Sequence, residues 1–307
     1  MILTVTLNPA IDRTVLADRL VFEDRAYILA RGESAGGRGI NASMVCHRLG
    51  SPTLAILPSG GDSGPRLEAD LRKLGFPFEI VPAAANVRSN LIITDRQGLT
   101  IKLNEPGPEL TAEELDRLEA AVRRHLPTTQ WLLICGSLPP GVPRDYYRRL
   151  IRAAAESGVR TLVDTDGDVL QDCLLEQPTA VTPNRMEAAA LLNKALITRQ
   201  HFRAAAIRIL EMGAKSVVLS LGARGALGAM GGEIVEAVAP RVEAISPIGA
   251  GDALNAALAW ALSRGSDFAD AVRWGVAAGT ASAMLPGMQF ANLEQTRAIY
   301  DRVELRG

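Results

Sequence analysis

The chain has 307 residues, of which 48% are hydrophobic and 22% charged. This composition is typical of a globular protein with a sizeable core and excludes a largely disordered chain. The formal net charge is −1 at pH 7, so no overall field attracts nucleic acid or an acidic membrane, and neither is expected as a partner. Any anionic ligand must therefore be held by a local site.

The cysteines and the apolar segments indicate a cytoplasmic protein. The first residues, Met1–Pro9, lack a basic segment and a cleavage site, and they predict a first strand rather than a signal. The uncharged stretch Trp274–Leu293 is rich in small and polar residues and is interrupted at Pro286, so it predicts a buried helix, not a membrane span. Three cysteines without a CxxC pair argue against a secreted disulfide framework: Cys46, Cys135 and Cys173.

Short aliphatic runs alternate with longer segments of helical periodicity. This alternation predicts an α/β fold, with a mostly parallel sheet covered by helices on both faces. In chain order the predicted elements are strand Ile2–Leu7, helix Asn41–Leu49, strand Thr53–Leu57, helices Asp62–Leu74 and Ala112–His125, strand Trp131–Cys135, helix Pro143–Ser157, strands Arg160–Asp164 and Ala180–Thr182, helices Asn184–Leu192 and Gln200–Met212, strand Ser216–Ser220, and helices Asp252–Arg264, Phe268–Met284 and Leu293–Val303.

Two segments interrupt this alternation, residues 14–31 and 89–103. Both have alternating patterns and turn signals, such as Asp95–Gly98, with no helix between them. They predict a small antiparallel sheet or lid attached to the main layer. No repeat of fixed period and no low-complexity linker is found, so residues 1–307 are predicted to form one domain with a lid.

The run Gly249-Ala250-Gly251-Asp252 directly precedes an apolar helical segment. Two glycines at this place leave backbone N–H groups approachable at the positive end of the helix dipole, which makes an anion site. The Asp252 carboxylate would accept a proton from a hydroxyl that attacks a phosphorus atom. The alternative is that Asp252 is an ordinary N-cap.

A second glycine run, Gly36-Gly37-Arg38-Gly39-Ile40-Asn41, also precedes a helical segment. Gly36 and Gly37 would let a ligand approach the backbone of a pocket floor, and Asn41 would bond its hydroxyls. Residues 37–42 also match the dinucleotide fingerprint, but they do not follow the first strand. A nicotinamide-dependent oxidoreductase is therefore a minor alternative.

Two further runs are candidates for the nucleotide side. Asn184 and Glu187 share the first turn of a predicted helix, where one would reach phosphate and the other would hold Mg²⁺ through water. A helix started after proline with an acidic first turn is the alternative. The run Ser220–Gly225 joins two strand-like runs and would either line a nucleotide or form a tight hairpin.

Three single residues complete the candidates. Asp12 follows the first strand, at the end of the sheet where open α/β folds bind ligands. Arg25 and Arg88 lie in the expected lid segments, where a sugar phosphate needs a cation, although isolated arginines are more often merely solvated. The three histidines have no ligand spacing.

Taken together, these motifs resemble the ribokinase/PfkB family of sugar kinases. Its amino-terminal signature is similar to Gly36–Ser43 with Gly50 and Gly60, and its carboxy-terminal signature is similar to Ser246–Ala256. The family's N-x-x-E motif is matched by Asn184 and Glu187. The resemblance covers essentially the whole chain.

The resemblance implies an α/β/α sandwich with a β lid, ATP as phosphoryl donor and Mg²⁺ as cofactor, with a monovalent cation as a further candidate. Asp252 would be the base, and Gly249, Ala250 and Gly251 the anion hole. Asp12, Gly37 and Asn41 would hold sugar hydroxyls. Asn184 and Glu187 would organise Mg²⁺ and phosphates, and ATP would be bordered by Ser220, Gly222 and Gly225. A homodimer formed through the lid is implied as well.

Within the family the chain looks most like the branch that acts on ketohexose monophosphates. That branch is resembled by Thr6–Asp12, by Asn104–Pro108 and by Cys135–Gly141, which contains Ser137 as a candidate substrate contact. Arg25 and Arg88 stand where the branch has phosphate-binding cations, and Arg38 and Gly39 belong to the same floor. We expect fructose 1-phosphate as the substrate, with fructose 6-phosphate or tagatose 6-phosphate as alternatives, and a non-catalytic sugar-phosphate sensor as the alternative of another class.

Three positions depart from the family's pattern. Thr182 replaces a lysine that many relatives have before Pro-Asn, which puts one contact to ATP in doubt. Pro247 replaces a frequent threonine and puts the details of a monovalent-cation site in doubt. Arg38 stands where many relatives have lysine or glycine, and it would add a phosphate contact.

Overall fold

The computed structural model describes residues 1–21 and 23–307; residue 22, inside the first expected lid segment, lies outside the described residues. The main layer is one large sheet, with strands β1 (Ile2–Val5), β4 (Thr53–Gly60), β5 (Phe78–Ala83), β8 (Trp131–Cys135), β9 (Arg160–Asp164), β10 (Ala180–Val181), β11 (Ser216–Ser220), β12 (Gly225–Met230), β13 (Glu233–Val238) and β14 (Glu304–Arg306).

The order of these strands is β14-β13-β12-β11-β10-β9-β8-β1-β4-β5. Every pair from β5 to β11 is parallel, and the three pairs from β11 to β14 are antiparallel. The carboxyl ends of the parallel strands therefore lie along one edge, where ligands bind in open α/β sheets.

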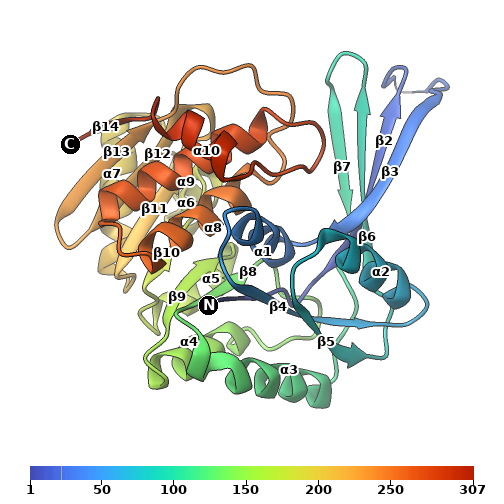
Figure 1. Ribbon diagram of the computed structural model, residues 1–307, viewed down its shortest axis with the longest axis horizontal. Helices are drawn as coiled ribbons and strands as arrows, with labels where there is room; N and C mark the ends of the chain where they lie inside the picture. Colours follow the sequence, from blue (N-terminus) through green and yellow to red (C-terminus); the bar gives the residue numbers. More distant parts are fainter. Residues whose placement is uncertain (22) are drawn as a thin grey trace.

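Helices cover both faces of this sheet (Figure 1). Their bounds are α1 (Arg38–Arg48), α2 (Gly64–Leu74), α3 (Ala112–His125), α4 (Tyr146–Glu156), α5 (Gly167–Leu174), α6 (Arg185–Leu191), α7 (Arg199–Glu211), α8 (Ala250–Ser263), α9 (Phe268–Ala283) and α10 (Leu293–Tyr300), with short 3₁₀ turns at Leu126–Thr128 and Gly222–Arg224. The expected α/β/α sandwich is confirmed.

Three apolar clusters form the core, and β1 contributes to the two largest. Leu3 packs with α3, α4, α5 and α7 on one face, whereas its neighbour Ile2 packs with α1, α8, α9 and α10 on the other. Adjacent residues of a strand point to opposite faces, so a strand covered on both sides is apolar throughout. This is the reason that Ile2–Val5 is a continuous buried run.

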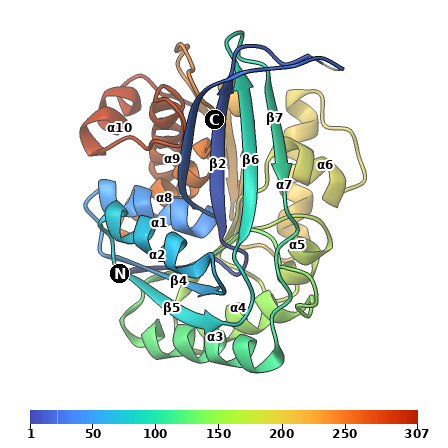
Figure 2. The same ribbon diagram turned by 90° about the vertical axis from the view of Figure 1, so that its right-hand side faces the viewer.

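The second sheet consists of β2 (Ala10–Ala17), β3 (Ile28–Gly36), β6 (Arg88–Asp95) and β7 (Thr100–Asn104). Its order is β3-β2-β6-β7, and it projects from the main layer beside α1 and α2 (Figures 1 and 2). The pairs β2–β3 and β6–β7 are antiparallel, and the central pair β2–β6 is parallel. The sheet is therefore mixed and extends beyond residues 14–31 and 89–103.

Helices α8 and α9 approach each other closely at two glycines of α9. A Cβ atom at Gly279 would lie 2.8 Å from the carbonyl oxygen of Ala250, and one at Gly275 would lie 3.0 Å from that of Leu254. The absence of side chains at these positions lets the two backbones pack directly together. Helix α9 thereby fixes the start of α8. No helix in the described part of the chain is long and apolar enough to cross a membrane.

Candidate active site

The start of α8 lies at the edge where the parallel strands end. Gly249 is its N-cap and has a φ of 77°, and the ring of Phe290 lies 2.7 Å from where a Cβ would be. Within residues 1–21 and 23–307, the N–H groups of Gly251 and Asp252 have no intramolecular acceptor, whereas that of Ala250 donates to the Pro247 carbonyl at 3.3 Å. Two N–H groups are therefore available to an anion, at the positive end of the helix dipole.

The Asp252 carboxylate lies in this first turn and contacts the second glycine run. Nδ2 of Asn41 donates to its Oδ2 at 2.7 Å. Burial and then the negative charge of Asp164 raise the pKa of Asp252 to about 7, against the opposing effects of the Asn41 hydrogen bond and the Arg38 charge. A carboxyl with such a pKa is poised to exchange a proton near neutral pH.

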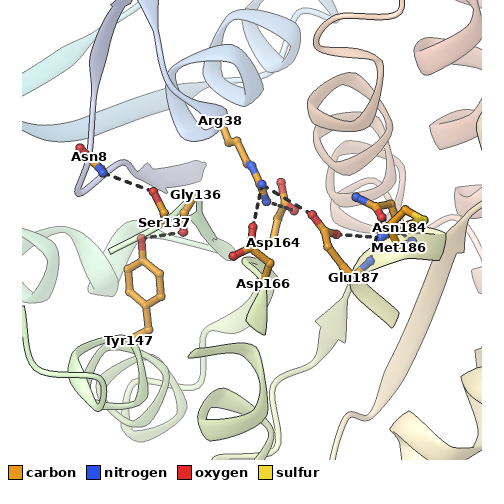
Figure 3. Close-up of polar contacts among 10 residues, drawn as sticks. All are labelled: Asn8, Arg38, Gly136, Ser137, Tyr147, Asp164, Asp166, Asn184, Met186 and Glu187. Carbon is orange, nitrogen blue, oxygen red and sulfur yellow. Dashed lines mark hydrogen bonds and ion pairs between the residues drawn. The ribbon is translucent and has the colours of Figure 1, made fainter. Parts of the chain in front are cut away.

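Arg38, the first residue of α1, joins three carboxylates (Figure 3). Its Nη1 donates to Oδ1 of Asp164 at 3.1 Å, and its Nη2 donates to Oδ2 of Asp166 at 3.1 Å. The same Nη2 lies 3.6 Å from Oε1 of Glu187. Burial lowers the pKa of Arg38, but the carboxylates outweigh it and the pKa is raised.

Asp12 is the third residue of β2, and its negative charge contributes to the raised pKa of Asp252. Nδ2 of Asn90 donates to its Oδ1 at 2.7 Å, and a Cβ at Gly36 would lie 2.1 Å from its Oδ2. Burial raises the pKa of Asp12, and the Asn90 hydrogen bond and the charge of Arg88 lower it in part. Gly36 is therefore needed for space around a buried carboxylate, not for a turn.

Arg88 begins β6, in register with Ala10 at the start of β2. Its Nη1 donates to the carbonyl of Glu105 at 2.9 Å, and burial lowers its pKa. The Nε of Arg88 is buried and has no hydrogen-bond partner among the described residues. A half-buried guanidinium with an unused buried donor is suited to an anionic ligand.

Ser137 follows β8 on the same side of the sheet. Its Oγ accepts a hydrogen bond from Nδ2 of Asn8 at 3.2 Å (Figure 3). Asn8 also donates to the carbonyl of Pro106. The loops after β1 and β8 are thus tied together beside the site.

Asn184 and Glu187 form a capping box at the start of α6. Oδ1 of Asn184 accepts from the N–H groups of Met186 and Glu187, and Oε2 of Glu187 accepts from the N–H of Asn184 at 2.8 Å. The remaining Oε1 faces Arg38. Oε2 of Glu187 therefore caps the helix, as one expectation has it, and Oε1 is the oxygen left for the other expectation, a role in holding a ligand.

Ser220 ends β11 next to this helix start, since Asn184 and Ser220 form a parallel bridge. Residues Gly222–Arg224 form a 3₁₀ turn, and β11 and β12 pair antiparallel across it. The run Ser220–Gly225 is therefore a hairpin connection, and it lies at the same edge as α6. Gly222 and Gly225 have positive φ angles of 62° and 98°.

One expected residue lies apart from the others. Arg25 is in the connection between β2 and β3, beyond the last paired residues Ala17 and Ile28. Asp12 is near the other end of β2, so within one chain Arg25 is at the outer end of the second sheet and the remaining candidates are at its base. The glycine run at 36–39 follows β3 of this sheet and not a strand of the parallel sheet, which removes the structural context of a dinucleotide fingerprint.

Sequence reasoning missed Asn90, Asp164 and Asp166. Asp164 ends the buried strand β9, and Asp166 follows two residues later. Carboxylates directly after a parallel strand were a usable signal, because these ends share one edge. Asn90 had no comparable signal, since its contact with Asp12 depends on the pairing of β2 with β6.

The donor set fits a hydrated divalent cation better than a protein cage. No group of three or more His, Cys, Asp or Glu side chains in the described part of the chain has the arrangement of a metal cage. Mg²⁺ usually keeps several waters and uses one or two carboxylates together with phosphates. Glu187 and Asp166 offer such carboxylates, because one oxygen of Glu187 and a side chain of Asp166 that is 49% exposed face the site.

Comparison with known proteins shows the family of the chain. ATP-dependent 6-phosphofructokinase isozyme 2 of Escherichia coli is 34% identical over 302 residues, which is 97% of each chain. A crystal structure of the phosphofructokinase-2 from Escherichia coli in complex with fructose-6-phosphate matches with a TM-score of 0.90 over 98% of each chain, at 34% identity. The 1-phosphofructokinase of Borreliella burgdorferi is 29% identical over 285 residues, or 92% of each chain. Residues 5–295 match the pfkB family of carbohydrate kinases, and the chain belongs to that family.

Proposed function

We propose that the chain is an ATP-dependent kinase that phosphorylates a free hydroxyl of a ketohexose monophosphate and yields a bisphosphate. The observation that carries the proposal is the position of the Asp252 carboxylate. It lies in the helical turn whose two backbone N–H groups have no acceptor among the described residues, and its Oδ2 accepts a hydrogen bond from Nδ2 of Asn41 at 2.7 Å. Phosphoryl transfer to an alcohol needs a positioned base beside a site for the charge of the phosphoryl oxygens, and this helix start supplies both.

In this mechanism Asp252 takes the proton of the attacking hydroxyl. Asn41 donates to Oδ2, which orients the carboxylate and leaves Oδ1 for the substrate. The N–H groups of Gly251 and Asp252 hold the negative charge of the phosphoryl oxygens. Arg38 lies between this turn and Glu187 and provides a positive charge on the nucleotide side. These groups are fixed before the reaction, so little reorganisation is required during transfer.

The sugar phosphate is proposed to lie between α1 and the base of the second sheet. Asp12, Gly37 and Asn41 would bind its hydroxyls, with Gly39 and Ser137 lining the same space. Its phosphate would pair with Arg88, whose buried Nε lacks a partner among the described residues. A guanidinium recognises a phosphate through a pair of parallel hydrogen bonds.

The nucleotide is proposed to lie along α6 and the β11–β12 connection. Asn184, Ser220, Gly222 and Gly225 would border ATP, and Glu187 with Asp166 would hold Mg²⁺ through water. Bound Mg²⁺ neutralises phosphate charge. A monovalent cation near Pro247 is part of the proposal through the family resemblance alone. The three free, buried cysteines support a place in the cytoplasm.

Release of ADP tests the proposal directly. The panel is fructose 6-phosphate, fructose 1-phosphate, tagatose 6-phosphate, the unphosphorylated sugars and a reaction without sugar. We expect turnover with a ketohexose monophosphate and at least tenfold less with free sugars, because a free sugar leaves the guanidinium of Arg88 unpaired. Fructose 6-phosphate is placed first, since the relatives at 34% identity are named for it. Binding of these sugars without ADP release would favour a sensor, and reaction of free sugars alone would contradict the role of Arg88.

A further inference from the structure

A cavity of about 500 Å³ lies at the edge of the large sheet opposite to the candidate active site. It is found where three strands begin: Arg160 starts β9, Thr179 directly precedes β10, and Lys215 directly precedes β11. The active-site residues Asp164 and Ser220 are at the carboxyl ends of β9 and β11. The length of β9 separates the two edges by about 13 Å. The cavity is therefore not part of the active site.

Three acceptor oxygens in the wall of this cavity are already engaged. Both carboxylate oxygens of Glu176 accept hydrogen bonds from the guanidinium of Arg152, at 2.7 and 3.4 Å, and Arg148 donates to one of them as well. The carbonyl oxygen of Thr179 accepts from Oγ of Ser216 at 2.7 Å. The carboxylate in the wall is thus held by two guanidinium groups, which leaves a positive excess beside the cavity.

Donors in the same wall are left without acceptors. The hydroxyl oxygens of Thr161 and Thr179 accept hydrogen bonds from the backbone N–H of each other, at 3.2 and 3.1 Å. Neither hydroxyl donates to an acceptor within residues 1–21 and 23–307, so both O–H groups remain available. Lys215 also lines the cavity, and in the described part of the chain its ammonium forms no ion pair and no hydrogen bond.

We infer that this cavity is a second anion site, which binds a small compound through a phosphate group. Free donors beside engaged acceptors complement a ligand that accepts hydrogen bonds and carries negative charge. A phosphate group offers three acceptor oxygens and nearly two negative charges, more than a carboxylate does. It matches the ammonium of Lys215 together with the hydroxyls of Thr161 and Thr179. The apolar side chains of Ile151 and Val159 also line the cavity and would contact the body of the compound.

Lysine footprinting of the full chain tests this site, with inorganic pyrophosphate as the probe and without a divalent cation. The chain has only Lys73, Lys102, Lys194 and Lys215, so the acetylation of each can be followed by peptide mass spectrometry. At about ten times its dissociation constant, pyrophosphate should slow the acetylation of Lys215 about tenfold. Lys194 is the internal control, because it is exposed and lies outside the cavity, and its acetylation should not change.

A carboxylate placed in the wall tests the preference for an anion by the same measurement. Ala155 is exposed on α4 and lines the cavity. Ala155→Glu should raise the dissociation constant of pyrophosphate, read from the protection of Lys215, about tenfold because like charges repel. Ala120→Glu is the matched control, since Ala120 is exposed on α3 and lies outside the cavity. It should leave the dissociation constant unchanged.

Unchanged acetylation of Lys215, or equal protection of Lys215 and Lys194, would overturn the inference in the wild-type chain alone. An equal effect of the two glutamate substitutions would overturn it as well. Malonate, a dicarboxylate, should protect Lys215 less than pyrophosphate does, and equal protection by both would contradict the assignment of a phosphate group. None of these measurements depends on turnover, so their failure would leave the proposed function standing.

Discussion

At the scale of single residues, the surroundings of Asp252 oppose its negative charge. Burial and Asp164 raise its pKa to about 7, while Asn41 and Arg38 hold it from rising further. Asp164 is itself held by Nη1 of Arg38 at 3.1 Å. The pKa of the proposed base is therefore raised first by burial and then by a neighbour that has no direct part in the proposed reaction.

This environment predicts a pH dependence. Since Asp252 must be ionised to accept a proton, kcat/KM should fall about tenfold per pH unit below pH 7. In Asp164→Asn the loss of a negative charge should lower the pKa of Asp252 and move this acid limb to lower pH. The measurement is kcat/KM against pH for both proteins. An acid limb that stays at the same pH or moves to higher pH in Asp164→Asn would contradict the account. The control variant Asp168→Asn should leave the acid limb at its wild-type pH.

At the scale of elements, the position of the helix start depends on packing far along the chain. Gly279 of α9 faces the backbone of Ala250, the first residue of α8. Replacing a glycine that is in van der Waals contact with another backbone forces the two helices apart. The anion site therefore depends on α9 as well as on its own glycines.

Gly279→Ala tests this dependence. We expect a loss of about 1–3 kcal/mol in unfolding free energy and a larger relative fall in kcat, because the two open N–H groups move. Gly275→Ala is the matched control, since it meets the carbonyl of Leu254, one turn further along α8. It should lose similar stability in urea unfolding and keep more activity. Equal activity losses in the two variants would mean that the start of α8 is not specially sensitive.

Most elements of the main layer were predictable from the sequence, because each is long or strongly patterned. Helix Ala112–His125 is found with the predicted bounds, and it begins with a capping box between Thr111 and Glu114. The helix expected from Asn41 begins at Arg38, so Arg38 is in its first turn. Strand β5 and helix α5 were not predicted, and β12 was expected only as a strand-like run after Gly225, without bounds. Strands β13 and β14 were not predicted either. They lie at the antiparallel end of the sheet, and β14 has only three residues, all exposed.

Site residues were predictable from the sequence only where a reactive or hydrogen-bonding residue type belongs to a recognisable local motif. Asp252 and Asn41 belong to glycine-containing runs, and the structure brings them together at 2.7 Å. Asp166 and Asn90 belong to no motif, because their contacts join segments far apart in the chain. Arg25 has the right charge for a phosphate but lies at the outer end of the second sheet. A suitable charge in the sequence therefore does not by itself show that a residue lies at the site.

At the scale of the whole molecule, the second sheet exposes large apolar side chains. Residues 28–33 of β3 are all exposed, and large apolar side chains are among the exposed residues of the sheet and its turns. Their exposed fractions are 63% for Tyr27, 60% for Ile28, 57% for Leu99 and 55% for Leu103. Such a surface favours association, and this supports the homodimer through the lid that the family resemblance implies.

Ile28→Glu tests the homodimer. A charge in an apolar interface should shift the protein toward monomer, because the carboxylate would be desolvated on association. Sedimentation velocity at several protein concentrations measures the state. Ile197→Glu is the matched control, an isoleucine that is 69% exposed and outside the second sheet. A wild-type monomer, or an equal effect of both substitutions, would contradict assembly through this sheet.

Asp252→Asn tests the central claim most directly, in the ADP-release assay with fructose 6-phosphate and its alternatives. The amide keeps the shape of the site but cannot act as the base, so kcat should fall by a factor of about 10³ or more while ATP still binds. Folding should not be the cause of this loss. Since the folded-state pKa of Asp252 is raised from 3.8 to about 7, its ionisation disfavours the folded state as pH rises between these values, and the amide removes that effect. The melting temperature of the variant at pH 8 should therefore equal or exceed that of wild type. Wild-type turnover in a folded Asp252→Asn protein would contradict the account.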